Sequence, residues 1–256
     1  MNTIKVTIQD KIAIIALDRG KSNAMNEVMI DELKKMFSSI AQDDNIGGVV
    51  LTGKEGFFTA GLDLIELYDY DESQMKIFWT KFLDLVKTIT SFKKPLVAAI
   101  SGHSPAGGCV LAICADYRIM AEGKFIIGLN EVPVGIIVPD SIFELYAFWI
   151  GKANAYRNLL EGKLMGTEEA KTIGLIDATA PIESLMTAAL KRVNLYMQFE
   201  QNTWQQSKLN LRKALIAKVS EDQTATLDTM LKQWWSPSTR SILKTIIENL
   251  QGKKVS

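Results

Sequence analysis

The stretch Gly128-Leu129-Asn130-Glu131-Val132-Pro133-Val134-Gly135-Ile136-Ile137 separates a short run of strand-forming residues, which begins at Phe125, from a helical pattern over 141–150. It is therefore the loop of a strand-loop-helix unit. The loop places one carboxylate, that of Glu131, among apolar neighbours. Loss of solvation there raises the pKa of a glutamate and makes it a stronger base. Glu131 is a candidate general base; the alternatives are a surface position or a role in capping backbone amides.

The same alternation of strands and helices extends over the preceding residues. Apolar residues at 4–8 and 12–17, separated by Gln9-Asp10-Lys11, predict a hairpin. Periodic segments further along predict helices over about 29–40, 75–92 and 105–115, and strands over 49–52, 96–100 and 117–120. Strands that alternate with helices of this length indicate an α/β fold with largely parallel strand pairing.

Residues 183–256 have a different pattern. Nearly all of this segment has helical spacing, and glycine and proline are rare in it. Its end carries an apolar and aromatic face, which a helical tail usually buries against the core or a partner subunit: Trp234, Trp235, Ile242, Leu243, Ile246, Ile247 and Leu250. We therefore expect a core over 1–182 and a C-terminal helical region over 183–256 that serves oligomerisation and closure of the pocket.

The composition argues against several classes of function. Lysine plus arginine and aspartate plus glutamate both number 29 in 256 residues, so no net charge attracts nucleic acid or an acidic membrane. A single histidine, His103, and the absence of a CxxC spacing argue against a metal site. No apolar run reaches the ~18 residues that span a bilayer, and the first residues begin a strand pattern instead of a targeting segment. Cys109 and Cys114 suit buried thiols in a reducing compartment, which predicts a cytoplasmic protein.

Two glycine-containing loops are predicted near the candidate base. Residues 56–64, Gly-Phe-Phe-Thr-Ala-Gly-Leu-Asp-Leu, follow a strand, and small residues at Ala60 and Gly61 allow close approach to the backbone. Residues 103–109, His-Ser-Pro-Ala-Gly-Gly-Cys, begin a helix in whose first turn Pro105 fits. Free backbone amides in such loops attract negative charge. One amide from each loop suits an oxyanion hole, although each loop alone is also consistent with ordinary turn chemistry.

Together these motifs resemble the crotonase, or enoyl-CoA hydratase/isomerase, superfamily. The resemblance covers nearly the whole chain and includes Ser22-Asn23-Ala24-Met25 and, within 167–177, Thr-Glu-Glu-Ala and Gly-Leu-Ile-Asp. It implies a ClpP/crotonase-like spiral of strand-strand-helix units with a C-terminal helical region, assembled as a homotrimer or dimer of trimers. It also implies an acyl-CoA substrate in fatty acid metabolism such as β-oxidation, with coenzyme A as part of the thioester and no separate cofactor.

The functional positions of the superfamily carry over to matching residues. Glu131 matches the acid/base glutamate, and the backbone amides of Ala60 and Gly107 match the oxyanion-hole positions that bind the thioester carbonyl. By the same resemblance, the acyl-CoA contacts residues of three segments: Lys21, Ala24, Ala60, Gly61, Leu62, Asp63, Leu64, Gly107 and Gly108.

Val110 departs from the hydratase pattern. Hydratases carry a second glutamate at this position, and without it the pair that activates water is incomplete. The segments 104–112 and 128–131 resemble instead those of mitochondrial-type Δ3,Δ2-enoyl-CoA isomerases, which work with one glutamate. The resemblance implies that Glu131 removes a proton from C2 of a 3-enoyl thioester, that two amides hold the dienolate oxygen, and that Glu131 returns the proton at C4.

Two alternative functions stay open. The protein would be a hydratase or dehydratase if Asp140 or Glu144 supplied the second carboxylate, although Asp140 also suits a helix N-cap and Glu144 a solvated helix residue. Dienoyl-CoA isomerases use a carboxylate nearby, but Pro139 occupies its place. The other alternative is a non-catalytic acyl-CoA-binding homologue, since the superfamily includes such members.

Several remaining residues are more simply structural. His103 has no nucleophile in an elbow motif beside it, and Cys109 suits a small buried filler. Some aromatic residues line either a fatty-acyl tunnel or the core, and helical spacing cannot separate these possibilities: Phe78, Trp79, Phe143, Phe148 and Trp149.

Overall fold

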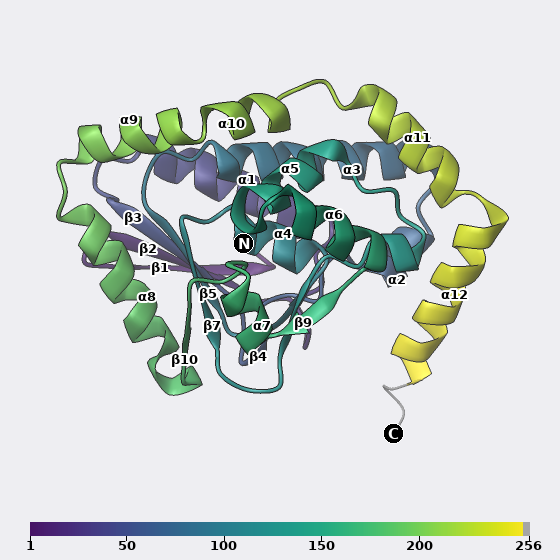
Figure 1. Ribbon diagram of the computed structural model, residues 1–256, viewed down its shortest axis with the longest axis horizontal. Helices are drawn as coiled ribbons and strands as arrows, with labels where there is room; N and C mark the ends of the chain where they lie inside the picture. The colour runs from purple at the N-terminus through teal and green to yellow at the C-terminus, as the bar shows by residue number, and fades with distance from the viewer. Residues whose placement is uncertain (253–256) are drawn as a thin grey trace.

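The computed structural model describes residues 1–252, which form two sheets surrounded by helices (Figure 1). The larger sheet has six strands in the order β1 (Ile4–Gln9), β2 (Ile12–Leu17), β3 (Gly48–Thr52), β5 (Leu96–Ile100), β7 (Tyr117–Ala121) and β10 (Ala178–Ala180). The smaller has the order β4 (Gly56–Phe57), β6 (Gly102–Pro105), β8 (Ile126–Gly128) and β9 (Leu164–Gly166). Only the pairs β1 with β2 and β8 with β9 are antiparallel. The predicted hairpin and the predicted largely parallel pairing are confirmed.

Successive segments of the chain contribute one strand to each sheet. β3 leads into β4, β5 into β6 and β7 into β8. Helices follow each pair: α2 (Leu64–Tyr68) with α3 (Glu72–Thr90), then α4 (Gly107–Ile113), and finally the short 3₁₀ turn η1 (Val132–Val134) with α5 (Asp140–Ile150). This is the predicted repeat of strand-strand-helix units. Because β4, β6 and β8 are parallel neighbours, the loops that follow them meet at one edge of the smaller sheet.

The first long helices begin at residues whose side chains cap backbone amides. The side chain of Asn26 accepts a hydrogen bond from the amide of Met29 at the start of α1 (Glu27–Gln42). Asp71 and Gln74 form a reciprocal capping box at the start of α3. The predicted apolar face of α1 is buried, with Leu33 and Phe37 fully inaccessible to solvent. Local sequence signals therefore define both where these helices begin and which face packs.

Residues 183–252 of the predicted C-terminal region are almost entirely helical. They form α8 (Ile182–Met197), α9 (Gln201–Leu211), α10 (Lys213–Val219), α11 (Thr224–Trp234) and α12 (Pro237–Gly252). Two shorter helices, α6 (Lys152–Glu161) and α7 (Thr167–Thr172), precede this region. Figure 1 shows α8 to α12 following one another around the periphery of the sheets. α8 covers the larger sheet by burying Leu185, Ala189 and Val193 against it. The last four residues of the predicted C-terminal region lie outside the described residues.

The predicted position of Pro105 is wrong. Pro105 does not lie in the first turn of a helix; it ends β6, where it pairs with Gly128, and α4 begins two residues later. Proline is tolerated there because its missing amide is not needed at the end of a strand. Ala106 makes the change of direction with a φ of +49°, and its amide donates to the Gly128 carbonyl at 2.8 Å.

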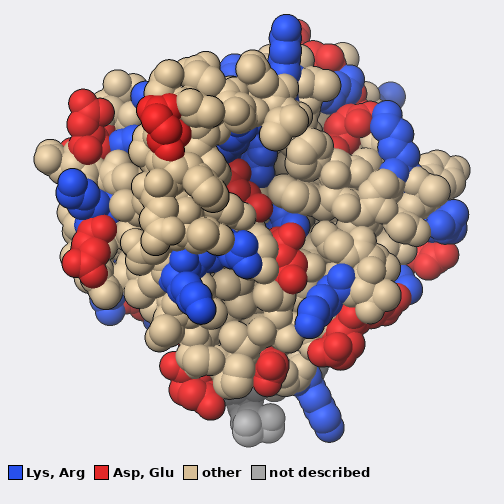
Figure 2. Space-filling view, turned by 60° about the vertical axis from the view of Figure 1, so that its left-hand side comes forward, with Lys and Arg blue, Asp and Glu red and all other residues tan. Residues whose placement is uncertain are grey.

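Two further features of the described chain are the character of its helices and the distribution of charge on its surface. Within residues 1–252, no helix combines the length and apolar character needed to cross a bilayer. On the face shown in Figure 2, basic and acidic side chains are interspersed instead of gathering by sign. This mixed surface fits the equal numbers of basic and acidic residues in the sequence.

Candidate active site

Glu131 follows the end of β8 in a turn that only a glycine permits. Gly128 has a φ of +147°, and a Cβ there would lie 2.3 Å from the carbonyl oxygen of Lys163. The chain then enters η1, where the carbonyl of Glu131 accepts hydrogen bonds from the amides of Val134 at 3.1 Å and Ile136 at 2.9 Å. These bonds hold the backbone of Glu131 in a fixed position.

The carboxyl group of Glu131 is dry and lacks a counter-charge. The residue is 9% exposed, and its Oε2 atom has no hydrogen-bond partner among residues 1–252. Burial raises the pKa of Glu131 from 4.5 to about 7. The predicted burial among apolar residues is therefore confirmed. A carboxylate that titrates near neutral pH is a much stronger base than a solvated one and is still available in its ionised form.

Glu131 lines a cavity of about 850 Å³, a size typical of small-molecule sites. Most residues that the resemblance assigns to acyl-CoA binding line it as well: Lys21, Ala24, Ala60, Leu62, Asp63, Leu64 and Gly107. Gly61 and Gly108 are not among its lining residues. α12 contributes Ile246 and Leu250 to the wall, so a helix from the end of the chain meets loops from its first half.

The structure does not support Ala60 as an oxyanion-hole donor. Its amide already donates to the carbonyl of Ser22 at 2.9 Å, so the bond that a ligand oxygen would need is made within the protein. Two residues further on, Leu62 also lines the cavity, and its amide has no acceptor within residues 1–252. Leu62, unlike Ala60, therefore has an amide that is free to bind a ligand oxygen.

Hydrogen bonds on either side of Leu62 fix the backbone around its free amide. The amide of Gly61 donates to Thr59 Oγ1 at 3.1 Å, and the amide of Asp63 donates to the carbonyl of Met25 at 2.9 Å. The Gly61 carbonyl in turn accepts from the amide of Met25 at 2.8 Å. The positive φ of Gly61, +89°, turns the chain between these bonds. Sequence spacing did not identify Leu62; the glycine before it is the only local signal.

Gly107 offers the second free amide. It is the first residue of α4, and its amide has no acceptor within the described chain. The two loops are in contact, since a Cβ on Gly61 would lie 3.2 Å from the Gly107 nitrogen, and one on Gly107 would lie 3.4 Å from Leu62 Cδ2. Two free amides, one at Leu62 and one at Gly107, therefore lie close together beside the cavity.

Val110 makes the cavity wall apolar one turn further along α4. It is 2% exposed and lines the cavity. A glutamate at this position would face the same space as Glu131. With valine there, Asp63 and Glu131 are the carboxylates among residues 1–252 that line the cavity. Asp63 is paired with Arg19 at 2.6 Å, so Glu131 is the one without a counter-charge.

Asp140 and Glu144 do not line the cavity. Asp140 pairs with Lys218 at 2.7 Å and Glu144 with Lys152 at 3.1 Å. The predicted N-cap role of Asp140 is wrong by one residue, because Pro139 occupies the N-cap and α5 begins at Asp140. Neither carboxylate is placed to act as a second group opposite the catalytic candidate.

The surroundings of His103 and Cys109 indicate that both residues have a structural role. The His103 ring packs against those of Phe57 and Phe125, with both pairs of ring centroids 5.2 Å apart, and its Nδ1 accepts from the amide of Ile126. Cys109 is fully buried, and burial raises the pKa of its thiol well above the usual range. Within residues 1–252, no group of three or more His, Cys, Asp or Glu is arranged to hold a metal ion.

Only one of the aromatic residues considered for an acyl tunnel lines the cavity. Trp79 does so, together with Phe82 on the same helix. Phe143 instead borders a separate cavity of about 440 Å³. Phe78 is buried in the core, and Phe148 and Trp149 pack against each other at 4.9 Å between ring centroids. The difference arises because helical spacing defines a buried face without defining what that face is buried against.

Comparison with known proteins agrees with this architecture. The enoyl-CoA hydratase/isomerase family model matches residues 7–250. Over 245 residues, covering 95% of this chain and 85% of the relative, the chain is 31% identical to the mouse protein "Enoyl-CoA delta isomerase 1, mitochondrial". It is also 32% identical to a probable enoyl-CoA hydratase of Rhizobium meliloti over 190 residues, 73% of this chain and 72% of that protein.

The crystal structure of human mitochondrial Δ3-Δ2-enoyl-CoA isomerase has the same fold. The TM-score is 0.94 at 28% sequence identity, covering 99% of this chain and 100% of that one. The predicted α/β crotonase-like fold is confirmed. Taken with the family match over nearly the whole chain, it shows that this protein is an enzyme of the enoyl-CoA hydratase/isomerase family.

Proposed function

We propose that the protein is an enoyl-CoA isomerase that moves a double bond of a fatty acyl-CoA from position 3 to position 2. The observation that carries the proposal is the dry, unpaired carboxylate of Glu131, which lines the same cavity as Leu62 and Gly107 with their free amides. Moving a double bond by one carbon requires one proton to leave and one to return. A single group that titrates near pH 7 suits both steps.

In the proposed reaction, ionised Glu131 accepts a proton from C2 of a 3-enoyl thioester. The electron pair of the C–H bond moves toward the thioester carbonyl and gives a dienolate whose charge lies mainly on oxygen. The amides of Leu62 and Gly107, instead of the predicted pair Ala60 and Gly107, donate hydrogen bonds to that oxygen. Such donors are each worth roughly 3–4 kcal/mol of barrier lowering. Protonated Glu131 then returns the proton at C4, which leaves the conjugated 2-enoyl product and regenerates the carboxylate.

The remaining features of the proposal follow from this chemistry and from the resemblance. The reaction changes no oxidation state and releases nothing, so it requires no cofactor beyond the coenzyme A of the substrate. We propose that the CoA portion lies along Lys21 to Ala24 and the loop from Ala60 to Leu64. Apart from Asn23 and Gly61, the residues of these two segments line the cavity. A role in fatty acid β-oxidation, a cytoplasmic location and a homotrimer or dimer of trimers remain predictions.

A hydratase activity is the second candidate, and the relatives named as probable hydratases are the observation in its favour. It requires a second carboxylate to orient water. Asp140 and Glu144, which were considered for that role, are paired with lysines outside the cavity, and Val110 occupies the usual position. These contacts favour the isomerase. A non-catalytic role is disfavoured because an unpaired buried carboxyl costs stability without adding any structural contact.

The first test is the substitution Glu131→Gln, which keeps the shape and removes the base. We expect the rate of formation of conjugated 2-enoyl-CoA from 3-enoyl-CoA to fall by about 10²- to 10⁴-fold, with binding of a saturated acyl-CoA retained. Glu144→Gln is the matched control, since it removes a carboxylate that does not line the cavity. Undiminished isomerisation by the Glu131 variant would contradict the proposal.

A substrate panel separates the candidate functions. The wild-type enzyme would be incubated with 3-cis, 3-trans and 2-trans enoyl-CoAs of several lengths, and both double-bond migration and water addition would be measured. Isomerisation of the 3-enoyl esters with little hydration of the 2-enoyl esters is the expected result. Dominant hydration would identify a hydratase, and tight binding of all esters without turnover would identify a non-catalytic protein.

A further inference from the structure

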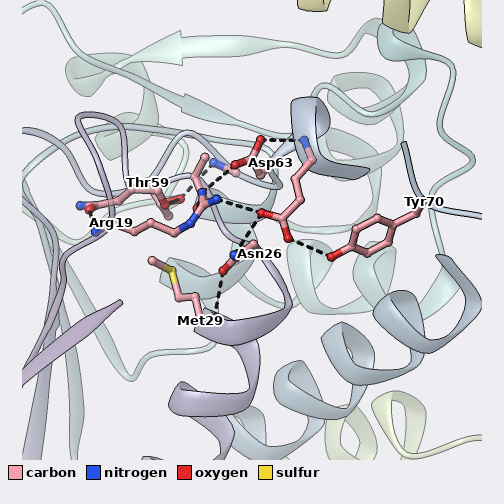
Figure 3. A network of polar contacts seen from close by, with 10 residues as sticks. Arg19, Asn26, Met29, Thr59, Asp63 and Tyr70 are labelled. Atoms are coloured by element: carbon pink, nitrogen blue, oxygen red, sulfur yellow. Dashed lines mark hydrogen bonds and ion pairs between the residues drawn. The ribbon is translucent and has the colours of Figure 1, made fainter. Parts of the chain in front are cut away.

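Arg19 lies at the rim of the cavity and joins two of its loops. Its Nη1 atom donates to Asp63 Oδ2 at 2.6 Å and to the carbonyl of Ala24 at 2.7 Å, and its Nη2 atom donates to Glu66 Oε2 at 2.9 Å. Figure 3 shows the guanidinium group between Asp63 and Asn26. One planar cation thus connects the segment before α1 with the start of α2.

The contacts on the far side of this network make it a firm support. Glu66 also accepts hydrogen bonds from Tyr70 Oη at 2.9 Å and from Asn26 Nδ2 at 3.1 Å. Asn26 is itself the N-cap of α1. The side chains of Arg19 and Asp63 are only 27% and 15% exposed, which reduces the screening of their interaction by solvent. The ion pairs of Arg19 are therefore connected to the first turns of two helices, α1 and α2.

The loop that Arg19 holds is the loop of the free Leu62 amide. Asp63 follows Leu62 directly, and Ala24 precedes Met25, whose backbone pairs with Gly61 and Asp63 around Leu62. Arg19 therefore binds a residue next to each partner of the β-bridge between Met25 and Leu62: Ala24 on one side and Asp63 on the other. A rotation of this peptide would direct its N–H away from the cavity while leaving the rest of the wall intact.

We propose that Arg19 is a positioning residue for the oxyanion hole, holding the Leu62 amide in the direction of the substrate carbonyl through Asp63 and Ala24. This inference rests on the proposed function. The planar fork of arginine allows its two Nη atoms to bind different partners, which the single ammonium of lysine does less well. A displacement of about 1 Å at a reacting group costs about 100-fold in rate. Removal of the Arg19 side chain is therefore expected to lower kcat and to leave substrate binding nearly unchanged.

The test compares Arg19→Met and Arg19→Lys with the wild-type enzyme. For Arg19→Met we expect kcat to fall about 10- to 100-fold, while KM and the Kd of a saturated acyl-CoA change by less than about 3-fold. Arg19→Lys should retain an intermediate kcat because one charged contact survives. Arg157→Met is the matched control, since Arg157 is exposed and does not line the cavity; its kcat should equal that of the wild type.

A spectroscopic measurement examines the oxyanion hole without turnover. Hydrogen bonds to the thioester carbonyl of a bound saturated acyl-CoA lower its stretching frequency, which isotope-edited infrared difference spectroscopy records. We expect this shift in the wild type and in Arg157→Met, and a return toward the value of the free thioester in Arg19→Met. Should Arg19→Met fail to fold, Asp63→Asn removes the same ion pair while keeping an acceptor for the Glu66 amide, and the same loss of shift is expected.

The outcomes separate this inference from the proposed function. If the wild type shows the carbonyl shift and both Arg19→Met and Asp63→Asn retain it with an unchanged kcat, the positioning role is wrong and the isomerase proposal stands. A rise in KM alone would show that Arg19 contacts the CoA portion directly, which also overturns the positioning role. If the wild type binds acyl-CoA without any carbonyl shift, the oxyanion hole itself is disproved, and both proposals fall.

Discussion

At the scale of a single residue, the carboxyl group of Glu131 links activity to stability. Burial raises its pKa to about 7, whereas the unfolded chain releases the proton near 4.5. Between these values the folded protein binds a proton that the unfolded chain has lost. The stabilising contribution of this group is therefore fully present below about pH 4.5 and is lost as the pH rises through 7. The difference amounts to about 3 kcal/mol.

This linkage predicts how Glu131→Gln changes the free energy of unfolding. The variant has no titrating group at this position, so its stability relative to the wild type should increase by about 3 kcal/mol between pH 4.5 and pH 8. Urea unfolding of both proteins at several pH values measures the difference, in which contributions from other titrating groups cancel. If the unfolding free energies of the two proteins differ by a constant amount across this pH range, the carboxyl group of Glu131 is not dry. In the wild type, kcat/KM should rise with pH up to about 7 as the base ionises.

Single residues differ in how much the sequence says about them. The dry position of Glu131 was predictable because its apolar neighbours are adjacent in the chain. The free amide was not, because Ala60 is engaged by Ser22 and Leu62 is left free by bonds that involve Met25, all of them tertiary contacts. Counting residues within a loop cannot show which of its amides has already found a partner.

At the scale of secondary-structure elements, α12 connects the two halves of the site. Arg240 donates to the carbonyl of Tyr68 at 3.0 Å and lies 3.4 Å above the ring of the same residue, at the end of α2. Thr239 donates to the carbonyl of Gly135, in the turn that follows Glu131, at 3.2 Å. α12 therefore contacts the helix that follows the Leu62 loop as well as the turn that follows the base.

These contacts predict that Arg240→Met weakens substrate binding. The substitution removes a hydrogen bond and a cation–π contact that together hold α12, and with it Ile246 and Leu250 of the cavity wall. We expect the Kd of a saturated acyl-CoA to rise about 3- to 10-fold, corresponding to about 1 kcal/mol. Titration calorimetry measures the change, and Lys244→Met, on an exposed position of the same helix, is the control. Equal affinities of Arg240→Met and the wild type would show that the contacts of Arg240 do not contribute to substrate binding.

Most elements were predictable because their signals are local. The hairpin, the buried strands and the capped helices follow from alternation, helical spacing and side-chain caps. Pro105 was misplaced because a proline with φ near −65° fits a strand end as well as a helix start, and the choice is made by pairing with Gly128 in a distant segment. The smaller sheet consists of strands of two to four residues, too short to produce a recognisable period.

At the scale of the whole molecule, the spiral explains how distant loops form one site. Each turn of the chain adds one strand to the smaller sheet, so the loops after β4, β6 and β8 meet although the sequence separates them by tens of residues. The sequence alone predicted the loops and their order, and the resemblance predicted that they converge. Which groups line the cavity depends on packing between the sheets and α12, which no local pattern encodes.

The outer surface carries an apolar groove that bears on assembly. The second cavity, of about 440 Å³, is bordered by Val132, Ile137, Phe143, Tyr156 and Leu160 together with neighbouring residues. Tyr156 and Leu160 are 62% and 56% exposed, which is unusual for neighbouring large side chains on a monomer. We expect this groove to be covered by another copy of the chain in the predicted homotrimer.

The prediction is that Leu160→Lys disrupts self-association, because a charge placed in an apolar interface loses its solvation without gaining a partner. Sedimentation velocity of the wild type should give a mass that is a multiple of 28.5 kDa, and the variant should sediment as smaller species. Ile8→Lys is the matched control, since Ile8 is 66% exposed and does not border the groove. If Leu160→Lys keeps the mass of the wild type, the groove is not the interface. If the Leu160→Lys variant dissociates and keeps the kcat of the wild type, each chain holds a complete site. This result is expected because loops and α12 of one chain form the cavity.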